Sequence, residues 1–161
     1  MDRLFTPWRY AYVNDSVDRA ATCVFCELAS ANPLDDESAL VVRRGGQHFV
    51  VLNRYPYNSG HLLVVPYEHV PRLSELSGES LTELFALTAQ AEKVLQEIYD
   101  PEGLNVGLNL GRCAGAGIAD HLHVHVVPRW SGDTSFMTVS GETRVLPEDL
   151  TETWHKLQGR F

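Results

Sequence analysis

The chain of 161 residues predicts an α+β fold, an antiparallel sheet with helices packed on one side. Three observations support this prediction. Short apolar, β-branched runs alternate with turn signals, and one long segment carries apolar residues at helical spacing. In addition, residues 121–127 read His-Leu-His-Val-His-Val-Val, with three histidines at every second position. The length fits one domain with its own hydrophobic core.

The predicted sheet begins with a hairpin. Residues 39–43 and 48–52 are apolar runs separated by Arg-Gly-Gly-Gln, a hairpin signal. Residues 61–65, which end at Pro66, are the third expected strand, and the alternating segment 104–110 is the fourth. The histidine segment 121–127 is expected to close the sheet.

A long helix is expected over residues 80–98. Ser80 with Glu83 three residues later matches a capping box, and Asp100-Pro101 ends the periodic pattern. The expected apolar stripe consists of Leu81, Leu84, Phe85, Thr88, Ala91, Leu95 and Ile98. A short C-terminal helix is expected to begin near Pro147 and to bury Leu150, Trp154 and Leu157.

Composition restricts the possible partners and the compartment. The formal net charge of −8 argues against broad nucleic-acid binding, because phosphates must be neutralised by Lys and Arg. No run approaches the roughly 18 apolar residues of a membrane span, and the N-terminus lacks the apolar core of a signal peptide. Three cysteines do not suggest a disulfide framework. We therefore expect a cytoplasmic protein with no membrane or nucleic-acid partner.

Cys23 and Cys26 form a Cys-x-x-Cys pair that is open to three interpretations. It could be half of a zinc site, a redox pair or two buried cysteines without a ligand. The redox interpretation requires a strand before the pair, and the preceding residues are polar and irregular. Zinc would need two further ligands, which His61, His69 and His121 could supply. Cys113 stands alone and is expected to be an inert small side chain.

The histidine row is the feature with the most chemical content. In a strand, His121, His123 and His125 share one face at about 7 Å between neighbours, while Leu122, Val124 and Val126 face a core. The row could bind a metal by itself, act in acid–base chemistry, attack an electrophilic centre such as phosphorus, or be structural. The glycine- and alanine-rich loop 111–117 favours phosphate chemistry, because its backbone N–H groups can hold anionic oxygens.

With hydrophobic residues between and after its histidines, segment 121–127 resembles the signature of the histidine triad (HIT) family. The resemblance extends to the stretches 52–56, 60–66 and 107–111, to the long helix, and to Pro-Arg-Trp after the triad. It covers residues 23–136 as a histidine triad domain. Residues 1–22 would then be an aromatic N-terminal arm that packs on the domain or on a partner, and 137–161 a C-terminal extension with the short helix.

The resemblance implies a role for each matching residue. His123 would be the nucleophile that forms a nucleotidyl-histidine intermediate, with its other ring nitrogen held by a backbone carbonyl. His125 would contact the phosphate or the leaving group, and His61 would complete the cluster. The nucleotide contacts would come from Asn53 at the ribose and from Asn109, Ala116 and Gly117 at the α-phosphate.

The resemblance also implies a structural zinc ion, a homodimer and a substrate class. The metal ligands would be Cys23, Cys26, His69 and His121. The substrate would be a dinucleoside polyphosphate such as diadenosine tetraphosphate, cleaved by phosphorolysis or hydrolysis. Many hydrolytic members carry Gln, Ser or Thr before the triad, where this chain has Gly-Ala-Gly-Ile at 115–118; small residues there leave room for inorganic phosphate. A nucleoside phosphoramidase and a non-catalytic nucleotide-binding module are the alternatives.

Overall fold

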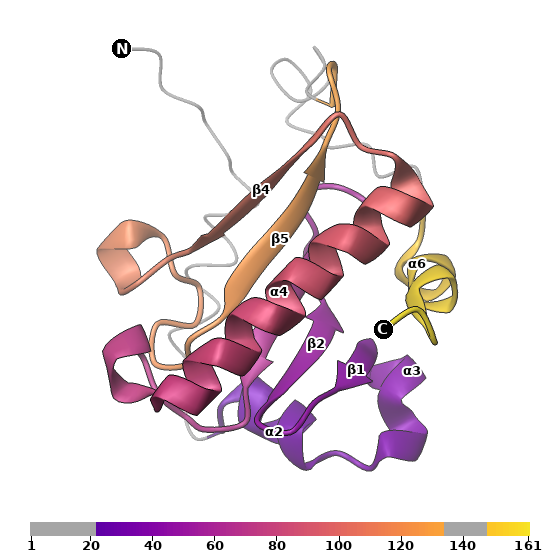
Figure 1. The fold of residues 1–161 in the computed structure, drawn as a ribbon. Helices are drawn as coiled ribbons and strands as arrows, with labels where there is room; N and C mark the ends of the chain where they lie inside the picture. Colours follow the sequence, from indigo (N-terminus) through magenta and orange to yellow (C-terminus); the bar gives the residue numbers. More distant parts are fainter. Residues whose placement is uncertain (1–21, 134–147) are drawn as a thin grey trace, which may run out of the picture.

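The computed structural model describes residues 22–133 and 148–161, which form an antiparallel sheet crossed by one long helix (Figure 1). The five strands lie in the order β1-β2-β3-β5-β4. Their bounds are β1 Val41–Arg44, β2 His48–Leu52, β3 Leu62–Pro66, β4 Gly103–Leu108 and β5 Val124–Arg129. The predicted α+β class and the predicted hairpin between the first two strands are confirmed.

The two helices that the sequence predicted, and several shorter elements, accompany the sheet. The main helix is α4, Gly78–Tyr99, and the C-terminal helix is α6, Leu150–Leu157. The short elements, which the sequence did not predict, are α2 Val24–Ser30, α3 Asp36–Ala39, and the 3₁₀ turns η1 Pro33–Asp35, η2 Leu73–Glu75 and η3 Arg112–Ala114. Elements this short contain too few turns to show helical periodicity.

Several predicted strand bounds were wrong at their ends. The first strand begins at Val41, because Ala39 ends α3 and Leu40 adopts a left-handed conformation with φ 61°. β4 ends at Leu108 rather than at residue 110. The last strand begins at Val124, so His121 and His123 lie in the segment that leads into it. There the N–H of Leu122 donates to the carbonyl of Val70 at 2.7 Å, outside the sheet ladder.

The predicted capping box at the start of α4 was also wrong. Ser77 is the N-cap, and its hydroxyl accepts from the N–H of Ser80 at 3.1 Å. The Glu83 carboxylate instead reaches the β1–β2 hairpin. There it accepts from the backbone N–H groups of Gly46 and Gln47 at 2.6 and 2.7 Å and from Nδ1 of buried His48 at 3.2 Å. Glu83 therefore joins the helix to the hairpin.

α4 covers one face of the sheet and fixes which side chains of β5 point to the other. The helix packs on β2, β3 and β5, and its buried stripe includes Leu84, Ala91 and Leu95. Phe85, expected on that stripe, is 53% exposed. At Gly60 (φ 77°) an added Cβ would lie 2.9 Å from Leu95 and 3.3 Å from Pro128. Pro128 thus faces α4, and the alternation of β5 directs the histidines to the opposite face.

The C-terminal helix α6 lies against the outer strand β1. Asp149 caps it by accepting from the N–H of Glu152, and Leu157 is fully buried. The indole Nε1–H of Trp154 donates to the carbonyl of Val41 at 2.8 Å. The predicted C-terminal helix is confirmed, whereas Pro147 and nearly all of the expected N-terminal arm lie outside the described residues. Within those residues, no helix combines the length and apolar composition that a membrane crossing requires.

The contacts of Glu83 predict a measurable contribution to stability. In Glu83→Ala two backbone N–H groups and His48 lose their acceptor. We expect the free energy of unfolding in urea to fall by about 1–3 kcal/mol at neutral pH. Glu92→Ala, at an exposed position of the same helix, is the control and should change that free energy by less than about 0.5 kcal/mol. Equal losses in the two variants would contradict the role of Glu83.

The same contribution should depend on pH. Burial alone would raise the pKa of the Glu83 carboxyl, but the hydrogen bonds from His48, Gly46 and Gln47 lower it below the ordinary 4.5. A carboxyl whose pKa is lower in the folded state stabilises fully above its unfolded pKa and loses that effect as the pH falls through the folded value. The stability difference between the wild type and Glu83→Ala should therefore shrink in acid; a constant difference would contradict this pH dependence.

Candidate active site and metal cluster

Strand pairing places the histidine row beside the glycine-rich loop. His125 pairs with Leu63 on β3 and with Gly107 on β4, and Val124 pairs with Leu108. Continuing the β4–β5 register brings Asn109 level with His123. The residues that end β4 and the residues that begin β5 therefore meet at one end of the sheet.

His123 is held by a short backbone contact and is almost fully buried. Its Nδ1 lies 2.9 Å from the carbonyl oxygen of His121, and the side chain is 7% exposed. Because a carbonyl only accepts, Nδ1 must carry the proton, which leaves the Nε2 lone pair available. Burial lowers the pKa of His123 below its ordinary 6.5, although the hydrogen bond with His121 opposes this shift. The imidazole is therefore neutral at pH 7.

His61 and His125 form a second pair, and hydrogen bonds fix its tautomers. Nδ1 of His61 accepts from the backbone N–H of Tyr57 at 3.1 Å. Its Nε2 must then carry the proton, which it donates to Nδ1 of His125 at 2.9 Å. A neutral His125 consequently carries its proton on Nε2. The His125 ring thus accepts a hydrogen bond at Nδ1 and can donate one at Nε2.

The predicted nucleotide-contact residues fall into two groups. Asn53 belongs to the turn before β3, where its Nδ2 lies 3.3 Å from Nδ1 of His61 and its Oδ1 accepts from Tyr55 N–H at 3.0 Å. Asn109, Ala116 and Gly117 belong to the loop between β4 and the row. The N–H of Ala116 donates to the carbonyl of Gly111 at 3.3 Å, a contact that closes this loop. Asn53 is therefore tied to His61, and the loop residues follow the end of β4 that pairs with Val124.

The four predicted metal ligands come together in one cluster. The ligand atoms of Cys23, Cys26, His69 and His121 all lie within 4.8 Å of one another. Nδ1 of His121 lies 3.3 Å from Cys23 Sγ and 3.7 Å from Cys26 Sγ, and Nδ1 of His69 lies 3.2 Å from Cys26 Sγ. Tetrahedral zinc with ordinary Zn–S and Zn–N bonds separates sulfur from nitrogen by about 3.5 Å. The donor set and its spacing therefore fit zinc.

The surroundings of His121 favour the same interpretation. Nε2 of His121 lies 2.8 Å from the carbonyl of Pro66, which fixes the proton there and leaves Nδ1 for a metal. Cys23 is the N-cap of α2, and Cys26 lies in its first turn. The helix opening that a redox pair requires is thus present. However, each thiol lies against a histidine nitrogen, which is the arrangement of a four-ligand metal site.

Two aromatic residues of the site were missed from the sequence. Phe25, between the two cysteines, is 4% exposed, and its ring centroid lies 5.3 Å from that of His121 and 5.1 Å from that of His123. The ring centroids of Tyr57 and His61 lie 4.6 Å apart. The position of Phe25 inside the Cys-x-x-Cys pair was the one available signal, because a residue there must share the cluster's surroundings.

Comparisons with known proteins agree with this geometry. Residues 36–132 match the HIT domain family. The chain is 45% identical to AP-4-A phosphorylase of Mycobacterium tuberculosis (strain ATCC 25618 / H37Rv), over 95% of this chain and 80% of that protein. It is 36% identical to bis(5'-nucleosyl)-tetraphosphatase [asymmetrical] of Schizosaccharomyces pombe, over 52% of this chain and 46% of that protein.

A solved structure gives the same result for the fold. The Zn-bound histidine triad family protein from Mycobacterium smegmatis superposes with a TM-score of 0.67 at 25% identity, over 90% of this chain and 94% of that one. The chain therefore belongs to the histidine triad (HIT) family, and the resemblance seen in the sequence is confirmed.

Proposed function

We propose that this protein is a nucleotidyl-transferring enzyme that cleaves dinucleoside polyphosphates, with diadenosine tetraphosphate as its substrate. The observation that carries the proposal is the state of His123: a buried, neutral imidazole whose Nδ1 is bonded to a carbonyl and whose Nε2 holds a lone pair. Similarity to the M. tuberculosis AP-4-A phosphorylase over most of both chains supports the substrate.

In the first step Nε2 of His123 attacks the α-phosphorus of the substrate. The new P–N bond forms as the bond to the bridging oxygen breaks, and the electron pair leaves on that oxygen as ATP. Nε2–H of His125 donates a hydrogen bond to this oxygen and stabilises its developing negative charge, while Nδ1 of His125 accepts from Nε2–H of His61. Asn109 and the loop around Ala116 and Gly117 would hold the α-phosphate oxygens, on which negative charge increases.

In the second step an oxygen nucleophile attacks the adenylyl-histidine and restores Nε2 of His123. With inorganic phosphate the P–N bond is exchanged for a phosphoanhydride, and ADP leaves; with water, AMP leaves. The proton of the attacking phosphate or water passes to solvent. We favour phosphate, because the small residues at 115–117 leave room beside the intermediate and because the similarity to a phosphorylase spans 95% of the chain. A non-catalytic nucleotide-binding module would not require a nucleophile with this tautomer.

The cluster of Cys23, Cys26, His69 and His121 would hold zinc as a structural ion. All four positions are occupied by side chains, which leaves no open site for a substrate. When bound, zinc would join α2 to the segment that carries His123. Paired thiolates of this kind persist in a reducing compartment, in agreement with a cytoplasmic location.

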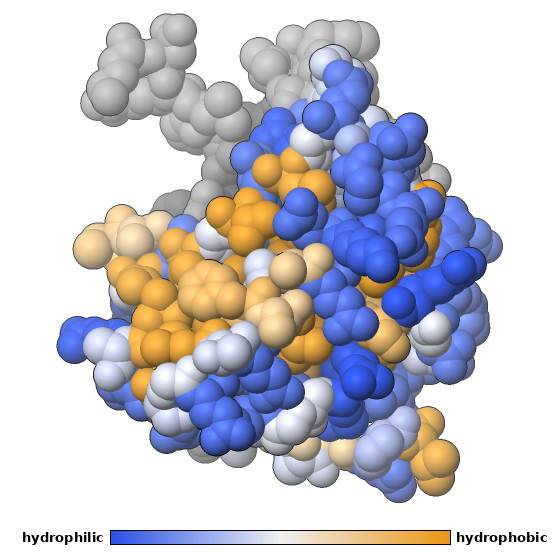
Figure 2. Space-filling view, viewed as in Figure 1, coloured by the Kyte–Doolittle hydropathy of each residue, from blue (hydrophilic) through white to orange (hydrophobic). Residues whose placement is uncertain are grey.

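The outer strand β4 supports a homodimer. It is the last strand of the sheet and contains no charged residue, and Val106 on it is 49% exposed. Leu110 and Phe85 are also exposed, and Figure 2 shows apolar atoms gathered over β4 and the first half of α4. An uncharged edge strand of this length is a template for another strand. Pairing of two β4 strands would join two sheets into one.

The reaction is tested by incubating the protein with diadenosine tetraphosphate, with and without inorganic phosphate. Phosphate-dependent release of ADP and ATP is expected; AMP and ATP would indicate hydrolysis. His123→Gly should lower turnover by at least about a thousandfold while circular dichroism stays unchanged. His155→Ala, at an exposed histidine of α6, is the control. Full activity in His123→Gly would exclude the covalent route.

The metal is tested by elemental analysis of protein dialysed against a weak chelator. One zinc per chain is expected in the wild type and in Cys113→Ser, whose thiol is exposed and lies outside the cluster. Cys23→Ser should lose the metal and unfold at a temperature lower by about 5 °C or more. A metal-free wild type with a Cys23–Cys26 disulfide would favour the redox interpretation.

The dimer is tested by light scattering coupled to gel filtration. The wild type should show twice the mass of one chain, and Val106→Asp should show the mass of one, because it places a charge at the centre of the edge strand. Leu34→Asp is the control, since Leu34 is 90% exposed away from β4. A monomeric wild type would refute the proposed dimer.

A further inference from the structure

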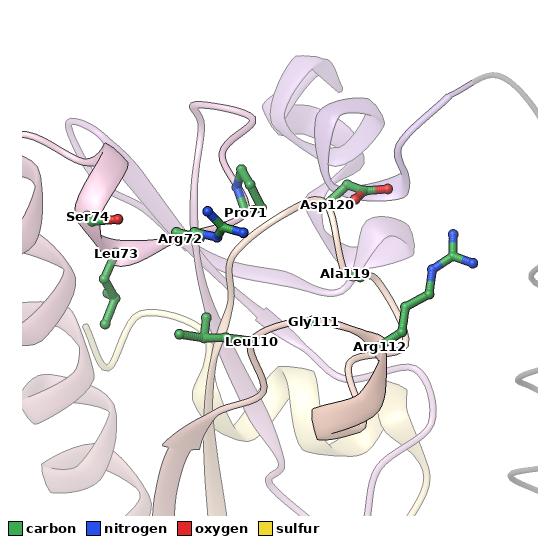
Figure 3. A pocket seen from close by; sticks show the side chains of 9 residues that line it. All are labelled: Pro71, Arg72, Leu73, Ser74, Leu110, Gly111, Arg112, Ala119 and Asp120. Carbon is green, nitrogen blue, oxygen red and sulfur yellow. The ribbon is translucent and has the colours of Figure 1, made fainter.

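A cavity of about 600 Å³ lies beside the loop that leads into the histidine row (Figure 3). Three segments form it: the chain around η2, the end of the β4 segment, and the residues just before His121. The lining residues are Pro71, Arg72, Leu73, Ser74, Leu110, Gly111, Arg112, Ala119 and Asp120.

The residues that form the cavity adjoin the candidate active-site residues in the sequence. Leu110 directly follows Asn109, which lies level with His123 in the β4–β5 register. The N–H of Leu122 donates to Val70, one residue before the wall that begins at Pro71. Asp120 and His123 are three residues apart, so their Cα atoms are separated by at most about 11 Å. The walls of the cavity are therefore direct continuations of the segments that carry Asn109 and His123.

The two arginines of the cavity are not engaged elsewhere. Neither guanidinium makes an ion pair or hydrogen bond within residues 22–133 and 148–161, whereas those of Arg44 and Arg129 are paired with Asp36 and Asp133. The chain as a whole carries a net charge of −8. Two uncommitted guanidinium groups at one cavity of an acidic protein indicate an anionic ligand, and the planar fork of Arg suits phosphate in particular.

The rest of the lining suits the nucleoside part of a nucleotide, which is less polar than its phosphates. Leu73 and Leu110 present apolar surface, and Leu110 is 44% exposed. Figure 3 shows these two side chains and Arg72 on one side of the cavity, and Arg112 and Asp120 on the other side. Apolar surface combined with a few polar groups is typical of a small-molecule site. Asp120 is the one acidic residue of the lining, and its side chain lies at the rim, away from the leucines.

We propose that this cavity holds the leaving nucleotide of the substrate, with Arg72 and Arg112 binding the phosphates beyond the α-phosphate. This inference rests on the proposed function. It implies that Arg72 and Arg112 select substrates by the number of phosphates in the polyphosphate chain. A substrate with several phosphates would span from His123 to the two arginines. A nucleoside monophosphate would reach neither.

Calorimetric binding of ATP and AMP tests the inference without requiring turnover. Arg72→Ala/Arg112→Ala should weaken ATP binding by about tenfold and leave AMP binding unchanged, because AMP has no phosphate beyond the first. Arg43→Ala is the matched control, since Arg43 is exposed on β1 and lies outside the cavity. Unchanged ATP affinity in the double variant, or an equal loss for AMP, would overturn the inference.

A second measurement separates the leaving nucleotide from inorganic phosphate, which has the same chemistry. In the phosphorolysis assay the double variant should raise KM for diadenosine tetraphosphate and leave KM for inorganic phosphate unchanged. A rise confined to KM for inorganic phosphate would assign the arginines to the co-substrate and overturn the inference. A wild type that binds ATP through both arginines but turns over no dinucleoside polyphosphate would refute the proposed function and retain the phosphate site.

Discussion

The hydrogen bond between Nδ1 of His123 and the carbonyl of His121 is the contact on which the rest of the site depends. At 2.9 Å it fixes the tautomer of a buried imidazole that has no other way to keep Nε2 unprotonated. The carbonyl belongs to a residue whose own ring is held by Pro66 on one side and faces two thiols on the other. One residue thus belongs to both groups: its side chain lies in the Cys/His cluster, and its backbone carbonyl holds the His123 ring.

Phe25 adds a second connection between the same two sites. It lies between two cysteines in sequence and between two histidine rings in space. Because Phe25 belongs to α2, the segment that carries both cysteines also supplies an apolar wall beside His123. Burial lowers the pKa of His123, so the wall also helps to keep the ring neutral. The metal cluster and the histidine row are consequently one packed unit rather than two neighbouring ones.

The sequence predicted the features that depend on local spacing and missed those that depend on contacts distant in sequence. Alternate residues of an extended segment share a face, so spacing alone singled out the three histidines, although β5 begins only at Val124. Glu83 lies three residues after Ser80, as in a capping box, yet its partners are amides 36 and 37 residues earlier. Phe25 could not be placed, because α2 is only 7 residues long. The residues alone offered His61, His69 and His121 as further zinc ligands, and only the family pattern selected His69 and His121.

The two outer strands of the sheet differ in what they offer a neighbour. On β1 the carbonyl of Val41 is occupied by the indole of Trp154, and a bulge interrupts the pairing of this strand with β2. On β4 an uncharged row of backbone groups faces outward in the part of the chain that the structure describes. If two chains pair through β4, both β4 edges are covered in the pair, and the outer edges of the joined sheet are two β1 strands. Further growth by strand addition would then have to begin at β1, where the Val41 carbonyl already accepts from Trp154.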